Sequence, residues 1–195
     1  MRIVAGSLKN RHIQTPKGVA TRPTAERLRE ALFNICQMYI ENASFLDLFS
    51  GSGAMGIEAL SRGAVHATFI DNNKESIRCI QDNLRLLELT QKALVQYGNV
   101  FSQLERLAQQ GKQYDIIYAD PPYDTRINVS GKPMLYSEYV LQIVDTHPLL
   151  APEGYLFIED ASDIALTQEG LQTLTFISSR RMGKAMLHQY RKVVA

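Results

Sequence analysis

Short runs dominated by apolar residues alternate along most of the chain with segments in which apolar residues recur every three or four positions. The short runs are typical of buried strands, and the wider spacing is typical of helices with one buried face. The alternation begins near residue 44 and continues to about residue 160. It predicts an α/β fold with a Rossmann-like, doubly wound sheet that is mostly parallel.

Turn and capping residues place the predicted elements. Asn72 or Asn73 can cap a helix, and a turn at Gly183 separates the last two strands into an antiparallel hairpin at the sheet edge. The capped helix carries its apolar stripe at Ile77, Ile80, Leu84 and Leu87. The other strands are predicted at residues 45–49, 66–70, 93–97, 114–119 and 155–159, the other helices at 54–62, 101–109 and 137–146, and the hairpin at 174–179 and 186–194.

The head of the chain does not follow this alternation. Residues 2–5 and 11–15 are expected to form two short strands around a turn. Thr24 is expected to cap a helix at residues 25–39. The predicted domains are an N-terminal basic extension at residues 1–40 and an α/β domain at residues 41–195.

The formal net charge is only +1, from 21 Lys or Arg and 20 Asp or Glu, and this total argues against a nucleic-acid-binding protein. The charges are unevenly distributed, however. Residues 1–35 carry seven basic and two acidic residues, and residues 180–195 carry five basic residues and no acidic one. If both basic ends face the active site, they can contact RNA phosphates. The residues predicted to bind RNA are Arg2, Lys9, Arg11, Lys17, Arg180, Arg181 and Lys184.

Several other classes of protein are disfavoured. The longest stretch without a charged residue, 93–104, is shorter than the roughly 20 apolar residues of a membrane-spanning helix. The N-terminus lacks the apolar segment of a secretory signal, so we expect a cytoplasmic protein with no membrane partner. Cys36 and Cys79 lie far apart, outside any metal-binding spacing, and no metal site is expected. The four histidines are scattered, and none is expected beside a nucleophile.

A glycine-rich segment, DLFSGSGAMG at residues 47–56, follows the first strand of the α/β domain. Glycine at positions 51 and 53 allows a sharp turn and a close approach of a ligand to the backbone. Asp71 lies 18 residues beyond Gly53, where an acidic side chain can accept hydrogen bonds from ribose hydroxyls. The Lys and Ser or Thr of a P-loop are missing after Gly56, which disfavours ATP and GTP. NAD, FAD and S-adenosylmethionine remain possible, as does a turn that binds no nucleotide.

The second motif is Asp120-Pro121-Pro122-Tyr123, at the carboxyl end of the strand predicted at residues 114–119. The two prolines stiffen the loop and remove backbone donors, which leaves carbonyl oxygens and a carboxylate. Asp120 and the Pro121 carbonyl can accept both N–H bonds of an exocyclic amino group, and Tyr123 can stack on the base. We expect these four residues to be catalytic and to lie near the glycine turn. A plain loop that ends a strand is the alternative.

Residues 47–56, Asp71 and the motif at residues 120–123 together resemble the class I S-adenosylmethionine-dependent methyltransferases that act on amino nitrogens. The head, with RIVAG at residues 2–6 and RPTAERLREALFN at residues 22–34, is similar to the RsmD family of bacterial 16S rRNA guanine 2-amino methyltransferases. The resemblance implies methylation of the 2-amino group of a specific guanine in 16S rRNA. S-adenosylmethionine is then the cofactor, S-adenosylhomocysteine is the product, and no metal takes part.

The resemblance also implies how substrate and cofactor are held. The substrate is an assembled or late-assembly small ribosomal subunit, and the protein is a monomer. Gly51 and Gly53 contact the methionine part of the cofactor, Asp71 holds the ribose, and residues 98–100 lie where relatives touch adenine. Asn99 departs from the Asp of many relatives, although an amide oxygen can accept the same bond. The predicted cofactor-binding residues are Arg22, Pro23, Thr24, Asp47, Phe49, Gly51, Gly53, Asp71, Asn72, Asn99, Val100 and Asp120, of which Arg22, Pro23 and Thr24 close over the site.

Three other functions use some of the same features. A DNA adenine-N6 methyltransferase shares the loop chemistry but usually needs a further sequence-reading region, for which 195 residues leave little room. A protein-glutamine methyltransferase usually carries Asn in place of Asp120. A non-catalytic scaffold or RNA-binding module needs no such loop. The polar segment at residues 124–133 is either a mobile lid or an ordinary surface loop.

Overall fold

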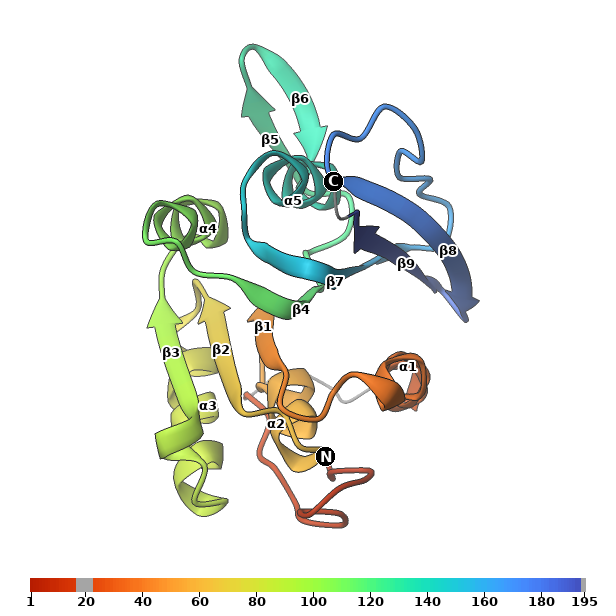
Figure 1. The fold of residues 1–195 in the computed structure, drawn as a ribbon. Helices are drawn as coiled ribbons and strands as arrows, with labels where there is room; N and C mark the ends of the chain where they lie inside the picture. Colours follow the sequence, from red (N-terminus) through yellow and green to blue (C-terminus); the bar gives the residue numbers. More distant parts are fainter. Residues whose placement is uncertain (17–22, 194–195) are drawn as a thin grey trace. The chain divides into compact units, whose positions relative to one another are not determined.

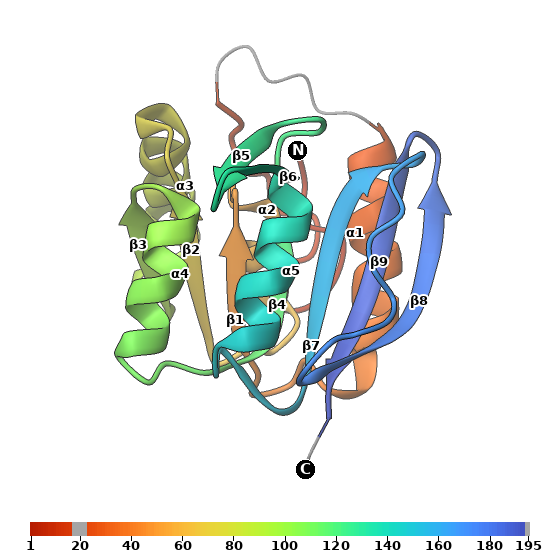
Figure 2. The same ribbon diagram turned by 90° about the horizontal axis from the view of Figure 1, so that it is seen from above.

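The computed structural model describes residues 1–16 and 23–193 of the chain, and only the backbone of residues 23–25. The chain divides into two compact units, Met1–Val100 and Phe101–Ala195. Figure 1 shows the order of helices and strands in each, and Figure 2 shows them from a direction at right angles. The predicted division at residue 40, which separates the basic extension from the rest, stays a prediction.

The first unit holds three parallel strands in the spatial order β3-β2-β1. Their bounds are β1 Ser44–Leu48, β2 His66–Asp71 and β3 Ala93–Tyr97. The connecting helices are α2 Ala54–Ser61 and α3 Lys74–Leu86, with the 3-10 turn η2 at Thr90–Lys92. Because the three strands are parallel, their carboxyl ends lie at one edge of the sheet.

Helix α3 follows from its cap and its apolar stripe. The side chain of Asn73 accepts hydrogen bonds from the backbone N–H groups of Glu75 and Ser76, at 2.8 and 3.4 Å. Asn73, rather than Asn72, is therefore the capping residue, and it satisfies two of the N–H groups that a helix start leaves unpaired. The four residues of the predicted stripe, Ile77, Ile80, Leu84 and Leu87, are all buried.

The head differs from the prediction. Its two short strands are reduced to a single bridge between Arg2 and His12. The reason is Glu58 of α2, whose carboxylate accepts the backbone N–H groups of Val4 and Ala5, each at 2.9 Å. These backbone N–H groups donate to the Glu58 side chain and are therefore not available for hydrogen bonds within a longer hairpin.

The first helix also differs from the prediction. Helix α1 spans Pro23–Ile35 and continues as the 3-10 turn η1, Cys36–Met38. Because the helix begins at Pro23, Thr24 lies inside its first turn and not at the capping position. Proline at the first helical position is favoured, since its missing N–H has no partner there in any case.

Glu58 is the centre of a buried ion cluster in the first unit. Arg62 lies 2.9 Å and Arg29 lies 3.3 Å from its carboxylate, and the side chains of Glu58 and Arg29 are only 1% and 2% exposed. Burial lowers the pKa of Arg29, whereas the nearby Glu58 raises it. Arg29 also donates to the carbonyl of Arg2 at 2.9 Å, so one cluster joins the head, α1 and α2.

The second unit holds four strands in the spatial order β4-β7-β9-β8. Strands β4 (Tyr114–Ala119) and β7 (Leu150–Ala161) are parallel, and β9 (Ala185–Lys192) is antiparallel to both β7 and β8 (Leu174–Met182). Figure 2 shows β7 and β9 side by side in opposite directions. The predicted antiparallel edge hairpin is confirmed. The helices are α4 Val100–Gln109, which begins at the boundary of the units, and α5 Tyr136–Thr146.

The polar segment at residues 124–133 forms most of a hairpin that the sequence did not predict. The hairpin consists of β5 (Arg126–Val129) and β6 (Lys132–Leu135), which pair with each other in antiparallel orientation. Ser130 and Gly131 connect them with φ angles of 51° and 84°. Two successive positive φ angles are the geometry of a type I′ turn, which matches the twist of a hairpin. Among the helices of the described residues, none is long and apolar enough to cross a membrane.

We predict that Glu58→Ala destabilises the protein by about 3–5 kcal/mol, because it leaves Arg29 buried without its partner and removes an acceptor of two backbone N–H groups. Urea unfolding followed by circular dichroism measures the change. Glu153→Ala is the control, since its ion pair with Arg191 is 62% exposed on the Glu153 side and is worth about 1 kcal/mol or less. Equal losses in the two variants contradict the prediction.

Candidate active site

The glycine-rich turn after β1 is held by its own polar groups and by β2. The Ser50 hydroxyl donates to the carbonyl of Asp47 at 2.6 Å and accepts the backbone N–H of Ile70 at 3.0 Å. The backbone N–H of Gly53 donates to the carbonyl of Ser50 at 2.7 Å. Gly51 and Gly53 have φ angles of 55° and 76°, in the left-handed region that glycine adopts without strain.

Asp47, a predicted cofactor-binding residue, has a partner inside the turn. Its carboxylate accepts the backbone N–H of Gly56 at 2.9 Å, and the side chain is buried. Burial raises the pKa of Asp47 well above its usual range and the nearby Asp71 raises it further, whereas the bond from Gly56 lowers it. The carboxylate therefore fixes the first turn of α2 against the end of β1.

Asp71 joins three segments at the carboxyl edge of the first unit. One oxygen of its carboxylate accepts the backbone N–H of Gly51 and the other accepts that of Asn73, each at 2.8 Å. Its carbonyl accepts the N–H of Gly98, beyond β3, at 3.0 Å. A carboxylate has about four acceptor positions, so the two bonds leave capacity for the hydroxyls of a ribose.

The three glycines of the segment serve different purposes. A Cβ built on Gly51 has no heavy atom within 4 Å, so this glycine borders open space. A Cβ on Gly53 would lie 3.1 Å from Ile80, and one on Gly56 would lie 2.3 Å from the ring of Phe69. Gly56 is therefore required for packing of α2 on β2, whereas Gly51 leaves room for a ligand.

Asn83 is a residue of this region that the sequence analysis missed. It is fully buried on α3, and its side-chain oxygen accepts the N–H of Gln14 at 2.7 Å. Its amide N–H₂ donates to the carbonyls of Gln14 and Ser52, at 3.0 and 3.1 Å. One side chain thus ties the head to the glycine-rich turn. The available signal was a polar residue next to Leu84 in the apolar stripe of a helix.

In the second unit, the Asp120-Pro-Pro-Tyr loop follows β4 directly. Asp120 and Pro122 are exposed, Pro121 is buried and Tyr123 is half-buried. The exposed carboxylate and the missing proline N–H groups give the loop the acceptor character that the sequence predicts.

The structure adds a hydrogen-bonded cluster to this loop. The Tyr123 hydroxyl donates to one oxygen of the Glu159 carboxylate at 2.7 Å, and the Tyr118 hydroxyl donates to the other at 2.6 Å. Burial raises the pKa of Tyr123 well above its usual range, and the negative charge of Glu159 raises it further. No local pattern in the sequence links these three residues, because Glu159 is far from both tyrosines along the chain.

The remaining predicted cofactor residues lie in or beside these segments. Phe49 is half-buried with a left-handed φ of 57°, Asn72 and Asn99 are exposed, and Val100 is buried. Arg22 lies outside the described residues, as do the side chains of Pro23 and Thr24. That the glycine turn, Asp71 and the Asp120 loop form one site stays a prediction.

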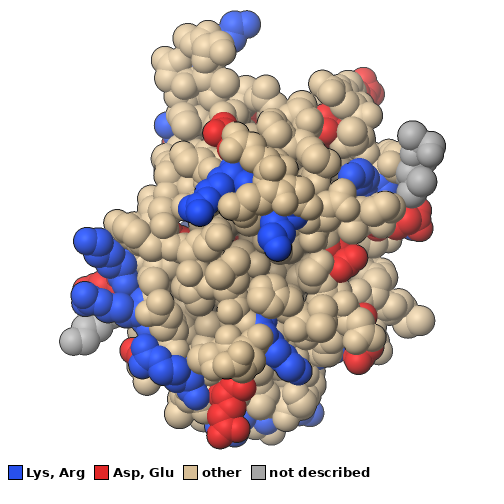
Figure 3. All heavy atoms as spheres, turned by 60° about the vertical axis from the view of Figure 1, so that its left-hand side comes forward, with Lys and Arg blue, Asp and Glu red and all other residues tan. Residues whose placement is uncertain are grey.

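Six of the seven predicted RNA-binding side chains are exposed, and Lys17 lies outside the described residues. Arg2 lies 3.7 Å from Glu26, and Arg11 donates to the carbonyl of Leu86 at 3.3 Å. Figure 3 shows one face of the molecule, on which Lys and Arg side chains stand in separate groups with acidic side chains among them. The exposed six are Arg2, Lys9, Arg11, Arg180, Arg181 and Lys184.

The expectation that no histidine lies beside a nucleophile is wrong for His188. Its Nδ1 lies 2.7 Å from the Ser179 hydroxyl, and burial lowers its pKa while Asp160 raises it. Its Nε2 and one carboxylate oxygen of Asp160 are buried without a hydrogen-bond partner among the described residues. Because Asp160 does not bond to the imidazole, the arrangement lacks the orienting acid of a hydrolytic triad.

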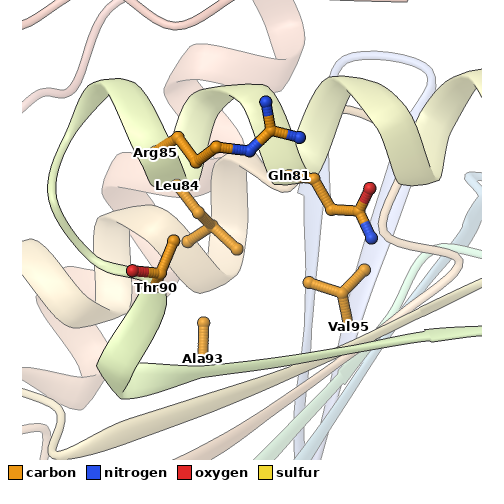
Figure 4. A pocket seen from close by; sticks show the side chains of 6 residues that line it. All are labelled: Gln81, Leu84, Arg85, Thr90, Ala93 and Val95. Carbon is orange, nitrogen blue, oxygen red and sulfur yellow. The ribbon is translucent and has the colours of Figure 1, made fainter.

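An open hollow lies between α3 and β3 of the first unit. Figure 4 shows its lining side chains: Gln81, Leu84, Arg85, Thr90, Ala93 and Val95. None of them is a predicted site residue, and the hollow includes no residue of the turn at Gly51. Within residues 1–16 and 23–193, no group of three or more His, Cys, Asp or Glu is arranged to hold a metal ion.

Comparisons with known proteins agree with this geometry. The family model described as "Conserved hypothetical protein 95" matches residues 1–191. "Putative rRNA methyltransferase YlbH" of Bacillus subtilis is 33% identical over 168 residues, which are 86% of this chain and 86% of the relative. "Ribosomal RNA small subunit methyltransferase D" of Escherichia coli strain K12 is 33% identical over 159 residues, 82% of this chain and 74% of the relative.

The fold is also found among solved structures. "Putative methyltransferase yhhF from Escherichia coli" is 29% identical to this chain, with a TM-score of 0.81 over 100% of this chain and 99% of that one. The predicted α/β fold class is confirmed by this likeness and by the strand order within each unit.

We predict that Gly51→Ala weakens binding of S-adenosylmethionine, the cofactor expected from the sequence, by at least about tenfold, because the new methyl group occupies the open space beside the turn. Gly111→Ala is a matched control: Gly111 has a φ of 66°, and a Cβ there also meets nothing within 4 Å. Both variants lose about 1–2 kcal/mol of stability from the left-handed backbone, but only Gly51→Ala loses affinity. Isothermal titration calorimetry measures the affinity, and unchanged binding by Gly51→Ala contradicts the prediction.

Proposed function

Because the chain belongs to the RsmD family of methyltransferases, we propose that it methylates the exocyclic 2-amino group of a specific guanine in 16S rRNA. The cofactor is S-adenosylmethionine and the product is S-adenosylhomocysteine. The observation that carries this proposal is the Asp120-Pro-Pro-Tyr loop, whose exposed carboxylate follows a strand and whose prolines leave acceptors but few donors. Such a loop is suited to holding an amino group.

The residues at the carboxyl edge of the first unit fit this cofactor. Gly51 borders open space, and the Asp71 carboxylate keeps acceptor capacity for ribose hydroxyls. Asn72 lies beside Asp71, and the amide oxygen of Asn99 can accept a hydrogen bond from the adenine amino group. When bound, S-adenosylmethionine supplies an electrophilic methyl group on a cationic sulfonium.

The protein's part in the reaction is mainly alignment. Asp120 and the Pro121 carbonyl accept the two N–H bonds of the guanine amino group, so the face of the nitrogen is directed at the methyl group. Tyr123 stacks on the base, which contributes about 1–3 kcal/mol. The amino group becomes acidic only as it is methylated, so Asp120 acts first as an orienting group and second as an acceptor of the proton.

The target guanine has to leave its base stack, because a paired base cannot present its amino group to such a loop. We propose that the substrate is an assembled or late-assembly small ribosomal subunit and that the protein acts as a cytoplasmic monomer. The names of the relatives support the ribosomal substrate.

We predict that Asp120→Ala lowers the single-turnover rate of methyl transfer at least about 100-fold while binding of S-adenosylmethionine is largely kept, because Asp120 is only one of the residues expected to contact the cofactor. Asp120→Asn loses less, because its amide oxygen can still accept one bond. Asp124→Asn is the control, since it neutralises an exposed carboxylate of the same loop and Asn tolerates its φ of 57°.

The assay uses radiolabelled S-adenosylmethionine with small ribosomal subunits, their precursors, naked 16S rRNA, DNA and protein, followed by mass spectrometry of the rRNA nucleosides. N2-methylguanosine in 16S rRNA is the expected product. Label in DNA or protein alone refutes the proposed substrate, and near-normal transfer by Asp120→Ala refutes the role of that residue.

Binding of the particle should also weaken with salt, because basic side chains release counterions from RNA phosphates. Replacing Arg180 and Arg181 together with Ala reduces the slope of log affinity against log salt by about 1–2, at roughly 0.9 per lost phosphate contact. Filter binding over a range of salt concentrations measures the slope. Arg191→Ala, whose guanidinium lies 2.6 Å from Glu153, should leave it unchanged. Affinity that does not depend on salt is incompatible with this interface.

A further inference from the structure

Tyr118, Tyr123 and Glu159 form a cluster whose hydrogen bonds have no part in the chemistry proposed above. Both tyrosine hydroxyls donate to the Glu159 carboxylate, one to each oxygen, at 2.6 and 2.7 Å. O–H···O bonds to carboxylates of this length are charge-assisted and about twice as strong as neutral ones. A carboxylate offers only acceptors, so both hydroxyls have to act as donors.

The register of β4 and β7 brings the three residues together. Tyr118 lies opposite Phe157, and Ala119 lies opposite Ile158. Glu159 is the next residue of β7, so it stands beside the point where the chain leaves β4 for the Asp120 loop. Tyr118 is only 3% exposed and is paired with β7 as the next-to-last residue of β4, which makes it a fixed anchor for one oxygen of Glu159.

The other oxygen of the Glu159 carboxylate accepts the hydrogen bond from Tyr123, the last residue of the Asp120 loop. Tyr123 is half-buried, so part of its side chain remains accessible while the hydroxyl is bound. The high pKa of its phenol keeps it protonated, and it stays a donor to Glu159 and not a base. The chain then turns at Asp124, with a φ of 57°, and the N–H of Tyr136 donates to the carbonyl of Thr125 at 3.0 Å.

We propose that Glu159 is a positioning residue: anchored by Tyr118, it binds the Tyr123 hydroxyl and so fixes the plane of the ring on which the target guanine stacks. The inference rests on the proposed function, since it assigns the ring to the substrate base. A tyrosine ring can change its orientation by rotation about two side-chain torsions. A hydrogen bond from its hydroxyl restricts this rotation and so fixes the orientation of the ring. Groups that contact a substrate keep their geometry through such supporting bonds, and a misplacement of about 1 Å can cost up to 100-fold in rate.

The experiment compares single-turnover methyl transfer to small ribosomal subunits in Glu159→Leu, Glu159→Gln, Tyr123→Phe and the double variant Tyr123→Phe with Glu159→Leu. We expect Glu159→Leu and Tyr123→Phe to lower the rate about tenfold, with KM for the particle changed less than about twofold, because orientation and not affinity is lost. Glu159→Gln recovers part of the rate, since its amide oxygen can still accept one hydroxyl.

The double variant decides whether Glu159 acts through Tyr123. If it does, Tyr123→Phe with Glu159→Leu is no slower than Tyr123→Phe alone, because the carboxylate has lost the group it positions. Tyr190→Phe is the matched control: it removes another tyrosine hydroxyl of the second unit, which donates to the carbonyl of Thr167 at 3.0 Å. It should keep the wild-type rate, and thermal unfolding shows whether each variant remains folded.

Three results overturn the inference while leaving the proposed function intact: a wild-type rate in folded Glu159→Leu, additive losses in the double variant, or an equal loss in Tyr190→Phe. Wild-type protein that labels no ribosomal RNA overturns the proposed function and this inference with it. Isothermal titration calorimetry with S-adenosylmethionine provides a readout that does not depend on methyl transfer. The affinity for S-adenosylmethionine should be unchanged in all of these variants.

Discussion

The turn after β1 is the constraint on which the first unit depends, because its glycines leave backbone N–H groups that need acceptors. Carboxylates from two neighbouring strands supply them: Asp47 accepts from Gly56, and Asp71 accepts from Gly51. The same residue, Asp71, also accepts from the segment beyond β3. The shape of the predicted cofactor site is therefore set by the ends of all three strands together.

The regular elements could be predicted because their signals are local. The stripe of α3 and its cap at Asn73 stand within one stretch of sequence, and the strand at Tyr114–Ala119 was predicted with its observed bounds. The prediction of two strands in the head was wrong because the backbone N–H groups of Val4 and Ala5 donate to Glu58, which lies more than 50 residues away in the chain. The hairpin at Arg126–Leu135 was missed because its strands are only four residues long and just one of their residues, Leu135, is buried, which leaves little apolar pattern to recognise.

The candidate site shows the same division. Its motifs, the glycine turn and the Asp120 loop, are contiguous in sequence and could be recognised together with the chemistry that they support. The residues that support these motifs could not be recognised from the sequence, because only the pairing of the strands brings Glu159 within hydrogen-bond distance of Tyr118 and Tyr123. For Asn83 the sequence contains only a weak signal of a structural role, a polar residue beside the apolar stripe of a helix. Sequence patterns thus identify groups that touch a ligand more readily than groups that hold them in place.

The bonds of Asn83 have a thermodynamic consequence. One buried amide contacts both Gln14, in the basic head, and Ser52, in the glycine turn. Displacement of either segment leaves this buried amide without one of its partners, which costs about 1–3 kcal/mol, so the head and the turn hold each other in place.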